Sequence, residues 1–171
     1  MQRPDQAVRD VKIANLVNAH YDVLLVHADK TVVTLDETYT LADLIREKIA
    51  YTGFVTEPGF EITSTPQQRP KKILVSQGGG AVGGELLQAV ARTTRHFPGY
   101  HFTFALGPYA KAELKGQLTT ELKRTGGGNW TVAPFIRDFE GELANSALSI
   151  SLAGYNTVMN LLHTRTAALV Y

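Results

Sequence analysis

The stretch KILVSQGGGAVGG, residues 72–84, decides the fold of this chain. It opens with a short apolar run, Lys72 to Val75, that is typical of a buried strand, and a helical pattern over 84–96 begins where the glycines end. Glycines let the backbone come close to a ligand, and the first turn of a helix offers unpaired N–H groups and the positive end of the helix dipole. The stretch therefore predicts a strand, an anion-binding loop and a helix, in that order.

The same alternation of strand and helix continues to the last residue. The further strands are predicted at 101–106, 130–133, 147–151 and 167–171, and the further helices at 109–124, 138–145 and 156–163. Strands that alternate with helices of this length form parallel βαβ units. We therefore expect an α/β fold with a doubly wound, Rossmann-like parallel sheet whose strands lie in the order 3-2-1-4-5.

A proline-rich segment, residues 56–70, divides the chain. It contains Pro58, Pro66 and Pro70 and shows no apolar period, which is typical of a linker, and its charged end at 69–72 is expected to be solvated. The Rossmann-like domain then occupies 71–171. Because the chain stops inside the strand at 167–171, we expect this domain to be truncated at its C-terminus, with an apolar edge that favours self-association.

Residues 1–55 are interpreted as the remnant of a preceding α/β domain. The elements predicted there are helices at 6–19 and 40–48, a strand at 22–27 and a short extended piece at 50–55. With a single good strand, this segment is not expected to form a sheet of its own.

A second loop of similar character, residues 154–157, follows the fourth predicted strand and leads into a helix, with Asn156 or Thr157 as the candidate N-cap. In the order 3-2-1-4-5, strands one and four are neighbours, and the crevice at their C-terminal ends is the place where such folds bind ligands. Two helix N-termini aimed at one place favour a doubly anionic group such as a diphosphate. The alternative is that each loop is only a tight strand-to-helix turn.

A dinucleotide site competes with this interpretation. Residues 78–83 satisfy G-x-G-x-x-G between a strand and a helix. That fingerprint requires an acidic residue about 20 positions further on to hold the ribose hydroxyls, and 96–112 contain no Asp or Glu. A nicotinamide or flavin oxidoreductase is therefore the second hypothesis.

Four segments carry a resemblance to a known group of proteins: YTGFV at 51–55, ILVSQGGG at 73–80, FIRDF at 135–139 and GYNTV at 154–158. Over residues 20–171 the chain resembles predicted glycosyltransferases related to the bacterial enzyme that adds N-acetylglucosamine to form lipid II. The resemblance implies the GT-B fold, in which two Rossmann-like domains face each other across a cleft. The C-terminal domain would hold the nucleotide-sugar donor, and the N-terminal domain the acceptor and the catalytic base.

The resemblance also implies roles for particular residues. The residues that correspond to the two diphosphate-binding segments are Gly78, Gly79, Gly80, Gly154, Tyr155, Asn156 and Thr157. Ile136 corresponds to the residue whose backbone reads the edge of the base. Asn160 stands where the family has a ribose-binding Glu, so Asn160→Glu is expected to strengthen the binding of UDP. A second departure is HTRT at 163–166, where the family has a Gly-Lys-Pro type of turn.

Composition excludes several classes of function. The chain has 171 residues with 17 basic and 16 acidic side chains, a balance that argues against a nucleic-acid binder. It has no cysteine, and its apolar runs are far shorter than the roughly 20 residues that span a membrane. No signal peptide is apparent, so a cytoplasmic location is expected. The five histidines lack metal-ligand spacing, and neither a metal nor a cofactor is expected.

The sequence thus predicts the donor-binding part of an inverting glycosyltransferase that uses a nucleoside-diphosphate sugar, with uridine as the expected base. The acceptor and the catalytic residues remain unassigned. A donor-binding subunit that needs a separate partner is a further alternative. Because a transferase must bring donor and acceptor together, this chain by itself is expected to have no transferase activity.

Overall fold

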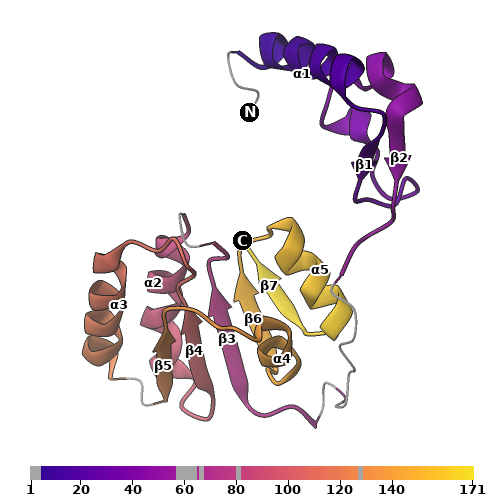
Figure 1. Ribbon diagram of the computed structural model, residues 1–171. Coiled ribbons are helices and arrows are strands. Elements are labelled where there is room, and N and C mark those ends of the chain that lie inside the picture. Colours follow the sequence, from indigo (N-terminus) through magenta and orange to yellow (C-terminus); the bar gives the residue numbers. More distant parts are fainter. Residues whose placement is uncertain (1–4, 57–64, 66–67, 80–81, 127–128) are drawn as a thin grey trace. The chain divides into compact units, whose positions relative to one another are not determined.

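The computed structural model describes residues 5–56, 65, 68–79, 82–126 and 129–171. The chain separates into two compact units, Met1–Val55 and Thr56–Tyr171, and each contains a sheet of its own (Figure 1). Much of the proline-rich segment, including Pro58 and Pro66, lies outside the described residues.

The larger unit is built on a five-stranded sheet in the order β5-β4-β3-β6-β7, with every neighbouring pair parallel (Figure 1). The strands are β3 (Lys72–Ser76), β4 (His101–Ala105), β5 (Trp130–Ala133), β6 (Leu148–Ser151) and β7 (Ala168–Val170). Counted along this unit, they are strands one to five, so the predicted order 3-2-1-4-5 is confirmed. The order reverses between β3 and β6, which is the topological switch point.

Helices cover both faces of this sheet (Figure 1). They are α2 (Gly84–Thr93), which continues into the 3₁₀ turn η4 (Thr94–His96), α3 (Ala112–Thr125), α4 (Phe139–Ala144) and α5 (Tyr155–Thr164). Ile73 and Val75 of β3 pack with α2 and α3, whereas Leu74 packs with Leu143 of α4 and Leu161 of α5. A strand that is covered on both faces has to be apolar throughout, which explains the unbroken run that identified it.

Trp130 lies at the start of β5, at the edge of the sheet. It is partly buried and packs against the core on the side of α2 and α3. This edge position follows from the order of the sheet, in which the third strand is the outermost one.

Arg69 anchors the end of the proline-rich segment. Its side chain is buried, with Nη1 donating to Thr166 Oγ1 at 2.8 Å and Nη2 donating to the carbonyl of Thr164 at 2.6 Å. Burial lowers the pKa of the Arg69 guanidinium. Nearby, Lys72 forms an ion pair with Glu142. The expectation that 69–72 is a solvated linker end is therefore wrong for Arg69, because the turn at 164–166 supplies acceptors that no local pattern reveals.

The smaller unit contains α1 (Gln6–His20), β1 (Leu24–Val26), the 3₁₀ segments η1 (Leu35–Glu37) and η2 (Ala42–Lys48), and β2 (Ile49–Tyr51). β1 and β2 pair in parallel, so this segment does form a small sheet, contrary to expectation. A parallel pair needs a long crossover, and the residues from Val26 to Ile49 supply it. The helix predicted at 40–48 is a 3₁₀ helix.

Lys48 ties the smaller unit together. Its Nζ donates to the carbonyls of Val17, Asn18 and Tyr21 at the end of α1, at 3.2, 2.9 and 2.7 Å. A cation at a helix C-terminus satisfies carbonyls that have no intrahelical partner. The contact links η2 to α1, and these elements contribute to a core formed mainly by Ala14, Val17, Tyr39, Ala42 and Ile45.

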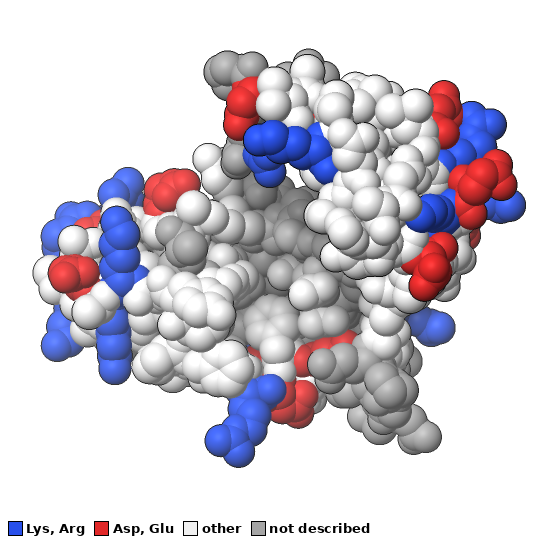
Figure 2. Space-filling model, turned by 45° about the horizontal axis from the view of Figure 1, so that its top comes forward, with Lys and Arg blue, Asp and Glu red and all other residues white. Residues whose placement is uncertain are grey.

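Basic and acidic side chains lie interspersed on the face shown in Figure 2. Arg92 and Arg124 both reach Glu121, at 3.3 and 2.7 Å. The hydrogen bond from Arg124 holds the pKa of Glu121 below its ordinary value. Exposed pairs of this kind contribute little stability, so the larger unit depends on its apolar core.

Candidate functional site

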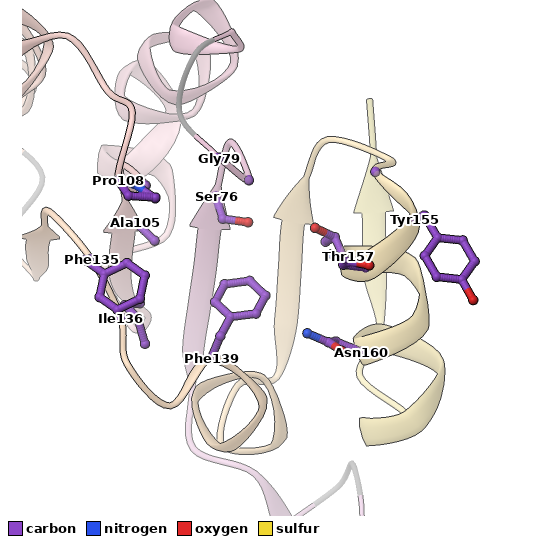
Figure 3. A pocket seen from close by; sticks show the side chains of 14 residues that line it. Ser76, Gly79, Ala105, Pro108, Phe135, Ile136, Phe139, Tyr155, Thr157 and Asn160 are labelled. Atoms are coloured by element: carbon purple, nitrogen blue, oxygen red, sulfur yellow. The ribbon is translucent and has the colours of Figure 1, made fainter. Parts of the chain in front are cut away.

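A cavity of about 430 Å³ opens at the C-terminal ends of β3 and β4 and beside the first turns of α5 (Figure 3). It is lined by Ser76, Gly78, Gly79, Ala105, Gly107, Pro108, Phe135, Ile136, Phe139, Gly154, Tyr155, Asn156, Thr157 and Asn160. This is the side of the switch point at which doubly wound sheets bind ligands. Its size is within the usual range for small-molecule sites.

The cavity brings together the site residues that the sequence singled out. Both segments 78–79 and 154–157 line it, together with Ile136 and Asn160. Gly80 lies outside the described residues. These residues are up to 82 positions apart in the chain, and the sheet order alone places their loops side by side.

Two loops meet at the glycine segment. Gly107 follows β4 with a φ of +87°, and a Cβ at this position would overlap the carbonyl oxygen of Gly78. Tyr109 N donates to Gly79 O at 2.9 Å, so the loop after β4 holds the glycine segment in place. Gly78 itself has a φ of +67°. Gly107 is a site residue that was not predicted from the sequence, although the Gly-Pro pair at 107–108 is a turn signal.

The start of α5 forms another wall. Gly154 is its N-cap residue in an extended conformation, and the first intrahelical bond runs from Val158 N to Gly154 O at 2.9 Å. The suggestion of Asn156 or Thr157 as N-cap is therefore wrong, because both residues already lie inside the first turn. That turn contains no acidic residue. Its N–H groups and dipole end favour an anion at the cavity.

The start of α2 does not share this cavity. Its N-cap, Gly83, has a φ of +91°, and Gly83 and Gly84 line a separate hollow with Gln77, Lys111 and other residues. A Cβ at Gly83 would lie 2.8 Å from Leu152 Cδ1, so the side chain of Leu152 fills the space beside this turn. Gly83 and Gly84 are not among the described residues that line the cavity, so the expected convergence of the α2 and α5 N-termini on it is wrong.

Asn160 is oriented by its neighbours. With its amide turned to suit the surrounding groups, Nδ2 donates to Glu140 Oε1 at 3.0 Å and to Asn156 O at 3.3 Å. Glu140 also lies 3.6 Å from Nδ1 of His163. Figure 3 shows the end of the Asn160 side chain directed into the cavity. In this orientation the carbonyl oxygen of Asn160 faces the cavity and can accept a hydrogen bond from a ligand hydroxyl.

The end of the cavity that lies across from α5 is apolar. Phe135, Ile136, Phe139 and Pro108 line it (Figure 3). Tyr155 directs its ring away from Phe139 and Ser76, so it lines the cavity mainly through its backbone. No Lys, Arg, Asp or Glu is among the described residues that line the cavity. It therefore combines an apolar surface with hydroxyl, amide and N–H groups.

Solved structures of glycosyltransferases match this chain. The glycotransferase of kitacinnamycin matches 99% of it with a TM-score of 0.57 at 12% identity, and the calicheamicin glycosyltransferase CalG4 matches 99% with a TM-score of 0.54 at 19% identity. S. aureus TarM, in a complex that contains UDP, matches 95% with a TM-score of 0.51 at 12% identity. The fold is that of GT-B glycosyltransferases.

The chain spans 44%, 43% and 32% of the lengths of these three proteins. No family model and no curated protein sequence matches it. At these identities the likeness concerns the fold, and a function has to be argued from the cavity.

None of the helices in the described residues has the length and apolar character to cross a membrane. The described residues also contain no group of three or more His, Asp or Glu side chains placed to hold a metal ion.

Proposed function

We propose that this chain is the donor-binding part of a glycosyltransferase that uses a nucleoside-diphosphate sugar, with uridine as the base. The observation that carries the proposal is the division of one cavity at the switch point into an apolar end and a hydrogen-bonding end. A nucleotide has the same division into a flat base and an anionic phosphate end. The GT-B fold of the chain and the UDP in the TarM structure agree with this choice.

Each part of the cavity then has a role. The base lies against Phe135 and Ile136, where its polar edge can reach the backbone. The ribose hydroxyls donate to the carbonyl oxygen of Asn160. The diphosphate faces the glycine segment and the first turn of α5, where Asn156 and Thr157 lie.

In an inverting transfer, an acceptor hydroxyl attacks the anomeric carbon, the bond from that carbon to the diphosphate breaks, and the acceptor proton passes to a base. Negative charge then develops on the leaving diphosphate. The dipole of α5 and fixed donors beside it stabilise that charge because they are oriented before the reaction begins. The acceptor and the base are left unassigned by this proposal.

A dinucleotide site remains the second candidate, because the glycine fingerprint at 78–83 follows β3 directly. Two observations disfavour it. The chain leaves β4 through Leu106, Gly107 and Pro108 without an acid that could hold a ribose, and the start of α2, where a pyrophosphate would lie, does not line the cavity.

The test is a calorimetric panel of UDP, UDP-N-acetylglucosamine, UDP-glucose, GDP-mannose and NAD with this chain. We expect UDP and at least one UDP-sugar to bind, and NAD to give no measurable heat. Tighter binding of NAD than of UDP would favour the dinucleotide site. Tighter binding of GDP-mannose than of the UDP-sugars would mean that the donor carries guanosine and not uridine. Absence of binding by all five would refute the proposal.

A further inference from the structure

Ser76 is the last residue of β3 and lies at the floor of the cavity. The residue is 1% exposed, and its Oγ has no hydrogen-bond partner among the described residues. Figure 3 shows this oxygen turned toward the side of the cavity that carries Thr157. A buried hydroxyl is therefore directed at the same space as the first turn of α5.

A buried hydroxyl without a partner is costly, by about 1–3 kcal/mol, and such groups are rare in folded proteins. Ser149 and Ser151 on β6 also have buried Oγ atoms without described partners, and by strand alternation they share a face of the sheet with Ser76. Neither of them lines the cavity. Ser76 thus differs from both in being a residue that lines the cavity.

The surroundings define what this hydroxyl can bind. The first turn of α5 supplies N–H donors and a positive dipole end, and no carboxylate is among the described lining residues. A serine hydroxyl among such donors completes a site for an acceptor-rich anion. The apolar end of the cavity lies apart from it, toward Phe135 and Ile136 (Figure 3).

We propose that Ser76 is a ligand-binding residue whose Oγ donates a hydrogen bond to a phosphate oxygen of a nucleoside diphosphate, at the phosphate group that faces the first turn of α5. This inference rests on the proposed function, because it assumes a nucleotide in the cavity. The missing partner of the Ser76 hydroxyl is then supplied by the ligand itself.

The experiment compares Ser76→Ala with Ser149→Ala in this chain. Ser149→Ala is a matched control, since it removes an equally buried and unpartnered hydroxyl from the same sheet, at a residue that does not line the cavity. The affinity for UDP is measured by calorimetry, the affinity for uridine by ligand-observed NMR, and the melting temperature without ligand by circular dichroism.

We expect Ser76→Ala to lower the affinity for UDP at least about 10-fold, which corresponds to about 1.4 kcal/mol of binding free energy. The affinity for uridine should change less than about 2-fold. Ser149→Ala should leave the affinity for UDP unchanged, and neither variant should lower the melting temperature. Unchanged UDP affinity in Ser76→Ala, or equal losses for UDP and uridine, would overturn the inference. If uridine binds too weakly to be measured, the UDP affinities of the two variants test the inference. Failure of the unaltered chain to bind UDP would instead refute the proposed function.

Discussion

Asn160 lies beside Glu140, and this neighbour changes what a substitution at position 160 should do. The sequence alone suggested that Asn160→Glu would strengthen the binding of UDP. In the structure, the Asn160 amide donates to Glu140 Oε1 at 3.0 Å. A glutamate at this position would lose that bond and place two carboxylates together.

We therefore expect Asn160→Glu to weaken UDP binding and to lower stability by about 1–3 kcal/mol at pH 7. Two adjacent carboxylates bind a proton more tightly in the folded state than in the unfolded chain, so the penalty should be small near pH 4 and grow as the pH rises. Thermal unfolding at pH 4 and pH 7 checks this. The double variant Glu140→Gln, Asn160→Glu should recover most of the loss, whereas tighter UDP binding by the single variant would contradict the prediction.

Asn156 and Thr157 supply donors at the first turn of α5. The double change to alanine should weaken the binding of UDP by about 1–3 kcal/mol, because hydrogen bonds to a charged ligand are lost. Calorimetry measures the loss, and Thr120→Ala on the exposed surface of α3 is the control. Equal affinities in the double variant and the control, with an intact fold, would remove these residues from the site.

At the scale of the elements, the loop after β4 fixes the glycine segment through Gly107. Gly107→Ala would force a side chain into a left-handed conformation and against the carbonyl of Gly78. We expect a loss of stability of at least about 1–2 kcal/mol and weaker UDP binding, measured by denaturant unfolding and calorimetry. Gly99→Ala is the control, since a Cβ there meets nothing within 4 Å. Equal effects of the two variants would mean that the close approach at Gly107 has no role.

Arg69 joins the segment before β3 to the turn between α5 and β7. Arg69→Ala should destabilise the larger unit by about 2–4 kcal/mol, because Thr164 O and Thr166 Oγ1 lose a charged donor in a buried place. The exposed Arg124, which pairs with Glu121, is the control, and Arg124→Ala should have a much smaller effect on stability. A similar urea midpoint for both variants would contradict an anchoring role.

At the scale of the whole molecule, the chain has one unit with the candidate-site cavity and a smaller unit with a two-stranded sheet. Transfer requires an acceptor hydroxyl, a base and the donor held at reacting distance. We expect this chain to bind UDP-sugar and to release no UDP from it over several hours, as measured by chromatography.

Release of UDP above the rate in buffer would contradict this prediction and would direct attention to His27, Asp138 and Glu140. Each of these has a structural partner, which for Glu140 is Asn160. His27 Nδ1 lies 2.8 Å from Thr52 Oγ1, and Asp138 caps α4 by accepting from Gly141 N at 2.8 Å. Alanine variants of the three would identify the group responsible.

The sequence by itself determined the elements of the larger unit and their order. Apolar runs such as 72–75 and helical periods such as the one predicted at 109–124 are local patterns, and the right-handed connection of parallel strands leaves few sheet orders open. The glycine segments at 78–79 and 154–157 could be placed together for the same reason, because loops at the C-terminal ends of neighbouring strands meet.

Only the tertiary structure decided which groups complete the cavity and its supports. Glu140 beside Asn160, Gly107 against Gly78, and Arg69 against Thr164 are pairs of residues that lie 20, 29 and 95 positions apart. The side chain of Leu152 likewise lies close to Gly83 at the start of α2, although the two residues are far apart in the chain. Local spacing sets the period and the ends of helices and strands, whereas these contacts depend on how side chains from separate elements fill the same space.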